Sequence, residues 1–222
     1  MIKAVLFDMD GLVLDSEIIY DRAMKTASEK ISYPLNDNFL NLTRGVNGEM
    51  FKELVLQVYG LDFPLEEFQA SYKQEFYKII ACEGVKVKQG FHNLMKFLNQ
   101  NHIKYCLVTS STRKMKTLLL EAAGIPEIFP YSICGDEVMY SKPDPYIYLK
   151  ACKKLGELPE NCMVLEDSKN GLIAGKAAGC MTVLIPDLMI PDVSMLEKSD
   201  YVIKDLDEVI PLISMQQDKG HC

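Results

Sequence analysis

Acidic side chains occur as two closely spaced pairs, and each pair follows a short apolar run. Asp8 and Asp10 are separated by one residue, whereas Glu166 and Asp167 are adjacent. Side chains two positions apart on an extended backbone point to the same side, so the first pair is expected to face one site. Like charges this close repel unless a cation lies between them or one acid is protonated. If the two pairs meet, their four carboxylates form the hard-oxygen site that Mg²⁺ accepts.

A purely structural explanation exists for either pair taken alone. Aspartates that follow a strand commonly cap helices or lie in solvated loops, and for one pair this explanation is as good as a functional one. Two pairs in matching positions, each directly after an apolar run, favour a shared polar site.

The apolar runs that precede these acids belong to a series that alternates with helical patterns. The runs show little internal alternation, which suits strands buried on both faces of a parallel sheet; they span residues 3–7, 105–108, 132–134, 162–165 and 181–185. Helical patterns lie between them at residues 90–100, 113–123, 146–155 and 171–178. We therefore predict an α/β fold whose core is a Rossmann-like, doubly wound parallel sheet. In such sheets ligands bind at the carboxyl ends of the strands.

The stretch from about Asp15 to Val85 has a different pattern. It contains long amphipathic segments at residues 18–30, 49–59 and 65–80, and no strand-like run of comparable quality. These segments predict an all-helical insert between the first strand and the rest of the sheet. The expected domains are therefore a sheet domain formed by residues 1–14 and 86–222 and a helical domain formed by residues 15–85.

The composition is that of an ordinary soluble globular chain. Of 222 residues, 48% are hydrophobic and 25% are charged. Lys and Arg number 24 against 31 Asp and Glu, which gives a formal net charge of −7. Such an acidic chain lacks the positively charged surface that binds nucleic acid or anionic membranes, so we expect neither as a partner. An anionic ligand would need positive charge concentrated at its own site.

The cysteines indicate a reducing compartment. None of the seven forms a C-x-x-C pair, and several lie in apolar runs where a free thiol behaves as a small hydrophobic group. The first apolar run is short and ends at Asp8, which argues against a secretory signal, and no run is long enough to span a membrane. We expect a cytoplasmic protein, and nothing in the sequence calls for more than a monomer.

Four short motifs occur in order along the chain. The first is Asp-Met-Asp-Gly-Leu-Val-Leu-Asp-Ser, from Asp8 to Ser16, and the second is Thr109 after Cys-Leu-Val. The third is Lys142 in Ser-Lys-Pro-Asp-Pro, and the fourth is Glu166-Asp167. In this order they resemble the four signatures of the haloacid dehalogenase superfamily of phosphotransferases. Their order and spacing extend the resemblance over essentially the whole chain. The chain looks most like β-phosphoglucomutases and related sugar-phosphate phosphatases, which carry a helical cap after the first motif.

The resemblance implies a chemical role for each motif residue. Asp8 would be the nucleophile that forms an aspartyl-phosphate. Asp10 would protonate the leaving alcohol and later take a proton from the attacking water. Thr109 and the amide of Ser110 would bind phosphate oxygens, and Lys142 would neutralise the charge that builds there. As simpler explanations, Thr109 merely finishes its strand and Lys142 is a solvated lysine in a turn.

The same resemblance implies Mg²⁺ as the cofactor. Its ligands would be Asp8, the backbone carbonyl of Asp10 and Asp167, with Glu166 bound directly or through water. An acid at the position of Asp10 also favours phosphate esters over carbon–halogen bonds, because halide leaves without a proton.

The helical insert is expected to select the substrate. Mutases of this group have a histidine near its start, where this chain has Tyr20, and an arginine on a later loop, which falls near Gly48 here. Tyrosine lacks an imidazole that titrates near neutral pH, and glycine lacks a guanidinium for a second phosphate. The candidate specificity residues are Glu17, Tyr20, Arg44, Asn47 and Lys73. Each is equally well explained as part of a solvated helix face or loop.

These features predict an Mg²⁺-dependent phosphatase of small phosphomonoesters, such as sugar phosphates or nucleoside monophosphates. A hexose-phosphate mutase of the β-phosphoglucomutase type is the alternative. A phosphate-binding regulator without turnover is a remote third explanation, which the presence of both Asp8 and Asp10 disfavours.

Overall fold

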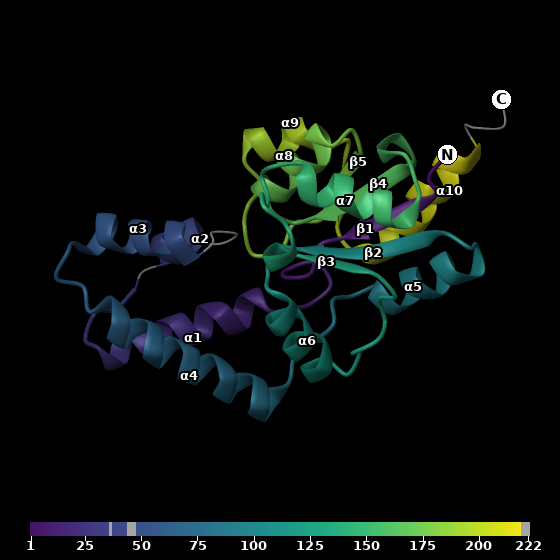
Figure 1. Ribbon diagram of the computed structural model, residues 1–222. Helices are drawn as coiled ribbons and strands as arrows, with labels where there is room; N and C mark the ends of the chain where they lie inside the picture. Colours follow the sequence, from purple (N-terminus) through teal and green to yellow (C-terminus); the bar gives the residue numbers. More distant parts are fainter. Residues whose placement is uncertain (36, 44–47, 219–222) are drawn as a thin grey trace. The chain divides into compact units, whose positions relative to one another are not determined.

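The computed structural model describes residues 1–35, 37–43 and 48–218. The chain divides into two compact units (Figure 1). One unit combines Met1–Asp15 with the chain from Lys86 onward, and the other is Ser16–Val85. None of the helices that the structure describes is both long and apolar enough to cross a membrane.

The first unit is built on a parallel sheet. Within the described residues it has six strands in the order β3-β2-β1-β4-β5-β6. The strands are β1 (Ala4–Phe7), β2 (Lys104–Thr109), β3 (Ser132–Cys134), β4 (Cys162–Glu166), β5 (Met181–Leu184) and β6 (Tyr201–Val202). This order reverses direction between β1 and β4, which is the point where doubly wound sheets bind their ligands. The predicted α/β class with a Rossmann-like sheet is confirmed.

Helices cover both faces of the sheet (Figure 1). They are α5 (Phe91–Gln100), α6 (Arg113–Ala122), α7 (Tyr146–Leu155), α8 (Lys169–Ala177), α9 (Val193–Lys198) and α10 (Val209–Asp218), with short 3₁₀ turns at Gly135–Glu137, Pro159–Asn161 and Leu206–Glu208. Leu6 belongs to a buried cluster with Ile147 of α7, whereas the ring of Phe7 meets the ring of Phe91 in α5 at a centroid distance of 6.2 Å. Because neighbouring residues of a strand point to opposite faces, α7 and α5 lie on opposite sides.

The strand register sets which side chains meet at the carboxyl edge. Phe7 is level with both Leu107 of β2 and Leu165 of β4. The amide of Asp8 continues the pattern by donating to the carbonyl of Leu165 at 3.1 Å. The residues that follow these strands therefore come out side by side.

The chain leaves and re-enters this unit through two paired segments. Leu14 forms an antiparallel bridge with Val87. The amide of Asp15 donates to the carbonyl of Lys86, and the amide of Lys88 donates to the carbonyl of Val13, both at 2.9 Å. The two connections to the helical unit are thus joined to each other at their base.

The second unit is entirely helical in the residues that the structure describes. Its helices are α1 (Glu17–Lys30), α2 (Asp37–Thr43), α3 (Gly48–Tyr59) and α4 (Leu65–Glu83). Buried Phe39, Phe63 and Phe68 lie in its core. Two ion pairs join α1 to α4, since Arg22 binds Glu83 at 2.7 Å and Lys30 binds Glu75 at 2.6 Å. The expected helical insert after the first motif is present.

Candidate active site

A buried lysine lies between two buried carboxylates at the carboxyl edge of the sheet. Lys142 Nζ donates to the Asp8 carboxylate, to Glu166 Oε1 at 2.6 Å and to the carbonyl of Val108 at 2.9 Å. The Lys142 side chain is only 4% exposed and that of Glu166 is fully buried. One ammonium group is therefore shared by the acid that follows β1 and the acid that ends β4, the strands on either side of the reversal in strand order.

Burial and charge shift the pKa values of these groups in a consistent way. Burial raises the pKa of Asp8 to about 8; the ammonium of Lys142 opposes that rise, while Glu166 and Asp10 add to it. Burial lowers the pKa of Lys142, but attraction to Asp8 and Glu166 outweighs it and the net pKa is raised. Lys142 therefore stays charged at neutral pH. A single positive charge does not fully compensate the acids around it, so a further cation is favoured.

Glu166 is held by partners on both of its oxygens. The hydroxyl of Tyr148, on α7, donates to Oε1 at 2.6 Å. The amide and hydroxyl of Ser168 donate to Oε2 at 3.2 and 2.8 Å, and the same hydroxyl caps α8. A Cβ on Gly171 would fall 1.8 Å from Oε1, so the carboxylate occupies space that only glycine leaves open. The Glu166 side chain is thus fixed from three directions.

Three acids offer oxygens to a common point. Within the described residues, Asp8, Glu166 and Asp167 each present a carboxylate oxygen, and these oxygens lie within 4.8 Å of one another. An all-oxygen, anionic donor set fits a hard divalent cation. The Asp10 carboxylate lies outside this group. The sequence predicted four carboxylates at one site, and the structure brings three of them together.

The Asp10 carboxylate accepts a hydrogen bond from a serine that follows β2. Ser111 Oγ donates to Asp10 Oδ2 at 2.9 Å. The amide of the same Ser111 donates to Thr109 Oγ1 at 3.0 Å, and Thr109 is the buried last residue of β2. The neighbouring Ser110 hydroxyl lies 3.1 Å from the hydroxyl of Ser141, next to Lys142 in the chain. The second and third motifs therefore meet beside the acids of the first.

Comparison with known proteins agrees with this geometry. Residues 2–179 match the sequence profile described as haloacid dehalogenase-like hydrolase. The chain belongs to the haloacid dehalogenase-like hydrolase family. It is therefore an enzyme, and members of this family generally use a divalent metal.

Two named relatives of this hydrolase are phosphatases. The chain is 30% identical over 177 residues to the phosphorylated carbohydrates phosphatase of Thermotoga maritima, covering 80% of this chain and 82% of that protein. It is also 30% identical over 188 residues to a probable pseudouridine-5′-phosphatase of Drosophila melanogaster, covering 82% and 80%. The structure matches that of a putative β-phosphoglucomutase from Thermotoga maritima with a TM-score of 0.79 and 26% identity, covering 96% and 99%.

Several residues of the hydrolase site were missed by sequence reasoning. Ser111 follows Thr109 and Ser110 in a polar run after β2, so a hydroxyl cluster at a strand end was the available signal. Ser168 has the position of an N-cap before a helix, which is also readable. Tyr148 lies inside an amphipathic helix, and nothing in that pattern distinguishes its hydroxyl from an ordinary core tyrosine.

The candidate specificity residues belong to the helical unit of the hydrolase. Glu17 begins α1, and Lys73 is exposed on α4. The ring of Tyr20 stacks on that of Phe76, with centroids 4.8 Å apart and an interplanar angle of 7°. This contact supports a packing role for Tyr20. The other two candidates, Arg44 and Asn47, lie outside the described residues.

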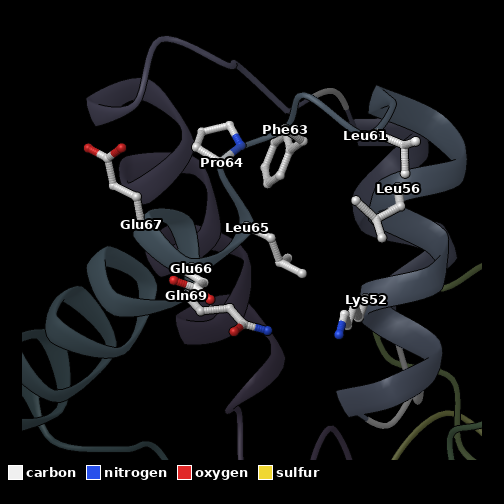
Figure 2. Close-up of a pocket in the computed structure, with 9 residues that line it drawn as sticks. All are labelled: Lys52, Leu56, Leu61, Phe63, Pro64, Leu65, Glu66, Glu67 and Gln69. Atoms are coloured by element: carbon white, nitrogen blue, oxygen red, sulfur yellow. The ribbon is translucent and has the colours of Figure 1, made fainter.

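The helical unit also contains a cavity of about 710 Å³ (Figure 2). Leu56 of α3 and Leu65 of α4 point into it, while Lys52 and Gln69 supply polar groups. None of the candidate specificity residues that the structure describes lines this cavity. None of its lining residues belongs to the four motifs.

Proposed function

We propose that this hydrolase is an Mg²⁺-dependent phosphatase of small phosphomonoesters, such as sugar phosphates or nucleoside monophosphates. The observation that carries the proposal is the buried Lys142, shared by Asp8 and Glu166 beside an all-oxygen acidic group. An anionic phosphoryl group needs positive charge where the nucleophile stands, and Lys142 supplies it within a chain of net charge −7. The names of the two phosphatase relatives support the same class of reaction.

In this proposal Asp8 attacks phosphorus and carries the phosphoryl group as an aspartyl-phosphate. Lys142 holds the Asp8 carboxylate in position and neutralises charge on the transferring group. Thr109 and the amide of Ser110 bind phosphate oxygens at the end of β2. These steps depend on positioning and charge more than on covalent assistance, which suits a set of buried, mutually fixed side chains.

Asp10 acts as the general acid and base. Its Oδ2 accepts a hydrogen bond from Ser111, and the carboxylate lies outside the three-acid group, so we assign it to proton transfer rather than to the metal. It donates a proton to the leaving alcohol and then takes one from the water that attacks the aspartyl-phosphate.

Mg²⁺ would be held by Asp8, Asp167 and the backbone carbonyl of Asp10, with Glu166 as a direct or water-mediated ligand. When bound, the ion neutralises charge on the phosphoryl oxygens. Glu166 already accepts from Lys142, Tyr148 and Ser168, so contact through water is the better assignment for it.

The helical unit would select the leaving group in this proposal, with Glu17, Tyr20, Arg44, Asn47 and Lys73 as candidates. A mutase is the second candidate function, favoured by the match to a putative β-phosphoglucomutase. Tyr20 and Gly48 replace the two mutase residues, and Tyr20 is engaged with Phe76. We therefore favour hydrolysis.

We also propose a cytoplasmic location, which suits the free thiols of the described cysteines.

The decisive experiment is a phosphate-release panel of hexose, pentose, polyol and nucleoside monophosphates, with Mg²⁺ or with EDTA. We expect release that requires Mg²⁺, loss of turnover by several orders of magnitude in Asp8→Asn, and a loss of about 10²–10⁴-fold in Asp10→Asn. Glu160→Gln is the control, because Glu160 is exposed and precedes β4 at the opposite edge of the sheet.

Undiminished release by a folded Asp8→Asn variant would contradict the covalent mechanism. Conversion of β-glucose 1-phosphate to glucose 6-phosphate in the presence of a bisphosphate primer, with little free phosphate, would instead establish the mutase. No turnover of any ester, together with phosphate binding, would favour the regulator.

A further inference from the structure

Asp187 is a buried acid that the proposed chemistry does not use. It follows β5, and its side chain is 7% exposed. Oδ1 accepts from Lys88 Nζ at 2.5 Å. Oδ2 is buried, and no group among the described residues is hydrogen-bonded to it. Half of this carboxylate is therefore paired and the other half is not.

The unpaired oxygen faces the acidic group of the site. A Cβ built on Gly11, whose φ is +77°, would lie 2.1 Å from Asp167 Oδ2 and 3.2 Å from Asp187 Oδ2. The two carboxylates thus approach the same glycine, directly after the first motif acids. Asp167 is one of the three acids whose oxygens converge.

This arrangement is unfavourable unless something else is bound. A buried carboxylate oxygen without a donor loses its hydration and gains nothing in return. A second carboxylate beside Asp167 adds repulsion between like charges. Lys88 supplies no hydrogen bond to Oδ2, because its ammonium group donates to Oδ1, and its charge is shared with Asp15, which lies 3.6 Å away. A hydrated cation relieves both, since it brings positive charge and water donors together.

We propose that Asp187 is a further acceptor of the divalent-cation site, with Oδ2 accepting a hydrogen bond from the water shell of the ion while Lys88 holds Oδ1. Asp187 is then a positioning residue that acts through the cation. The inference rests on the proposed function, because it assumes that the three-acid group binds Mg²⁺.

The simpler explanation is that Asp187 serves only as a counter-ion for Lys88. Asp15 offers a matched control, because it carries the same charge and contacts the same ammonium group. The atoms nearest to the position of a Gly11 Cβ belong to Asp167 and Asp187, not to Asp15. A role as counter-ion predicts similar behaviour of the two variants, whereas a role at the cation predicts a difference.

The test measures binding of Mg²⁺ alone to the full chain, without substrate, by titration calorimetry and by the rise in melting temperature. Asp187→Asn is expected to weaken Mg²⁺ binding about 10–100-fold, which is the usual effect of removing an outer partner of a metal site. Asp15→Asn is expected to bind Mg²⁺ as the unmodified protein does. Circular dichroism in EDTA checks folding; if Asp187→Asn is unfolded, Asp187→Ser replaces it, since a hydroxyl still accepts from Lys88.

Unchanged Mg²⁺ affinity in a folded Asp187 variant overturns the inference and leaves the proposed function intact. Equal losses in the Asp187 and Asp15 variants also overturn it and assign both acids to Lys88. Failure of the unmodified protein to bind Mg²⁺ refutes the metal-dependent function first, and the inference with it.

Discussion

Ser111 donates a hydrogen bond from its hydroxyl to Asp10 Oδ2 at 2.9 Å, across 101 positions of the chain. Its backbone amide simultaneously donates to the hydroxyl of Thr109. One residue at the end of β2 therefore fixes both the proposed acid of the first motif and the hydroxyl of the second. The geometry of the proposed proton transfer depends on a residue that no motif contains.

Replacement of Ser111 by alanine should slow turnover without unfolding the protein. A hydrogen bond to a charged group contributes about 1.5–3 kcal/mol, which corresponds to a decrease in kcat of about 10–100-fold if the bond serves only to orient Asp10. Steady-state phosphate release measures the effect. Ser199→Ala is the control, because that hydroxyl donates to the carbonyl of Leu196 at an exposed position. Equal kcat in both variants would show that Asp10 is oriented without Ser111.

Gly171→Ala should damage the metal-binding group more than it damages the fold. The added Cβ would lie 1.8 Å from Glu166 Oε1, so the carboxylate must move. Overpacking of this kind destabilises by about 1–3 kcal/mol, and here Mg²⁺ affinity should fall as well. Gly175→Ala on the same helix is the control, since the atoms nearest to its Cβ would be apolar ones of Thr182 and Val164, at 3.0 and 3.1 Å. Calorimetric Mg²⁺ titration that shows no difference between the variants would contradict the assignment.

Tyr148→Phe should lower stability, because Glu166 stays buried and loses one of its donors. Burial raises the pKa of Tyr148 well above its ordinary value, so the phenol is a proton donor at every pH of interest. Oε1 still accepts from Lys142, so the loss is that of one hydrogen bond to a charged group, about 1.5–3 kcal/mol. Urea unfolding should show a lower midpoint at unchanged slope. Tyr146→Phe, two residues earlier and exposed, should unfold like the unmodified protein; matching midpoints for the two variants would speak against the role of this hydrogen bond.

Mg²⁺ binding should strengthen as the pH rises. Burial raises the pKa of Asp8 from 3.8 to about 8 in the metal-free protein, so the ion must displace a proton at neutral pH. Affinity is therefore expected to increase about tenfold per unit between pH 6 and 8 and to level off above that. Titration calorimetry in buffers of different ionisation enthalpy should detect release of about one proton at pH 7. Affinity that does not change with pH would mean that Asp8 is already ionised.

The raised pKa of Asp8 also determines how the free energy of unfolding of the metal-free protein changes with pH. The folded state keeps the Asp8 proton between about pH 4 and 8, whereas the unfolded state does not. The Asp8 contribution to folding is therefore fully present below pH 4 and is lost as the pH rises through about 8. Unfolding measured in EDTA should follow this direction, and Mg²⁺ should reverse the loss.

The sheet was largely predictable because its strands are buried on both faces. The five expected runs agree with β1 to β5 to within one residue at each end, and β3 agrees at both ends. The two-residue β6 was missed, since two residues carry no periodicity. The short helices α2 and α9 and the C-terminal α10 were also not predicted.

The acids and the lysine of the site were predictable because they follow strands and fit ordered motifs. The groups that hold them were not. Lys88 and Asp187 lie 99 positions apart, and the pairing of Tyr148 with Glu166 depends on how α7 packs on β4. Such contacts arise from tertiary register, which local sequence patterns do not encode.

The paired segments around Leu14 and Val87 have an evolutionary consequence. They bring the two ends of residues 16–85 together within the sheet unit, so that this stretch is connected like a single long loop. All six described strands lie outside it, as do the acids and the lysine of the four motifs. Recombination that exchanges the stretch for that of another gene leaves the order of the described strands unchanged, so the helical unit can be replaced while the residues of the four motifs are inherited together.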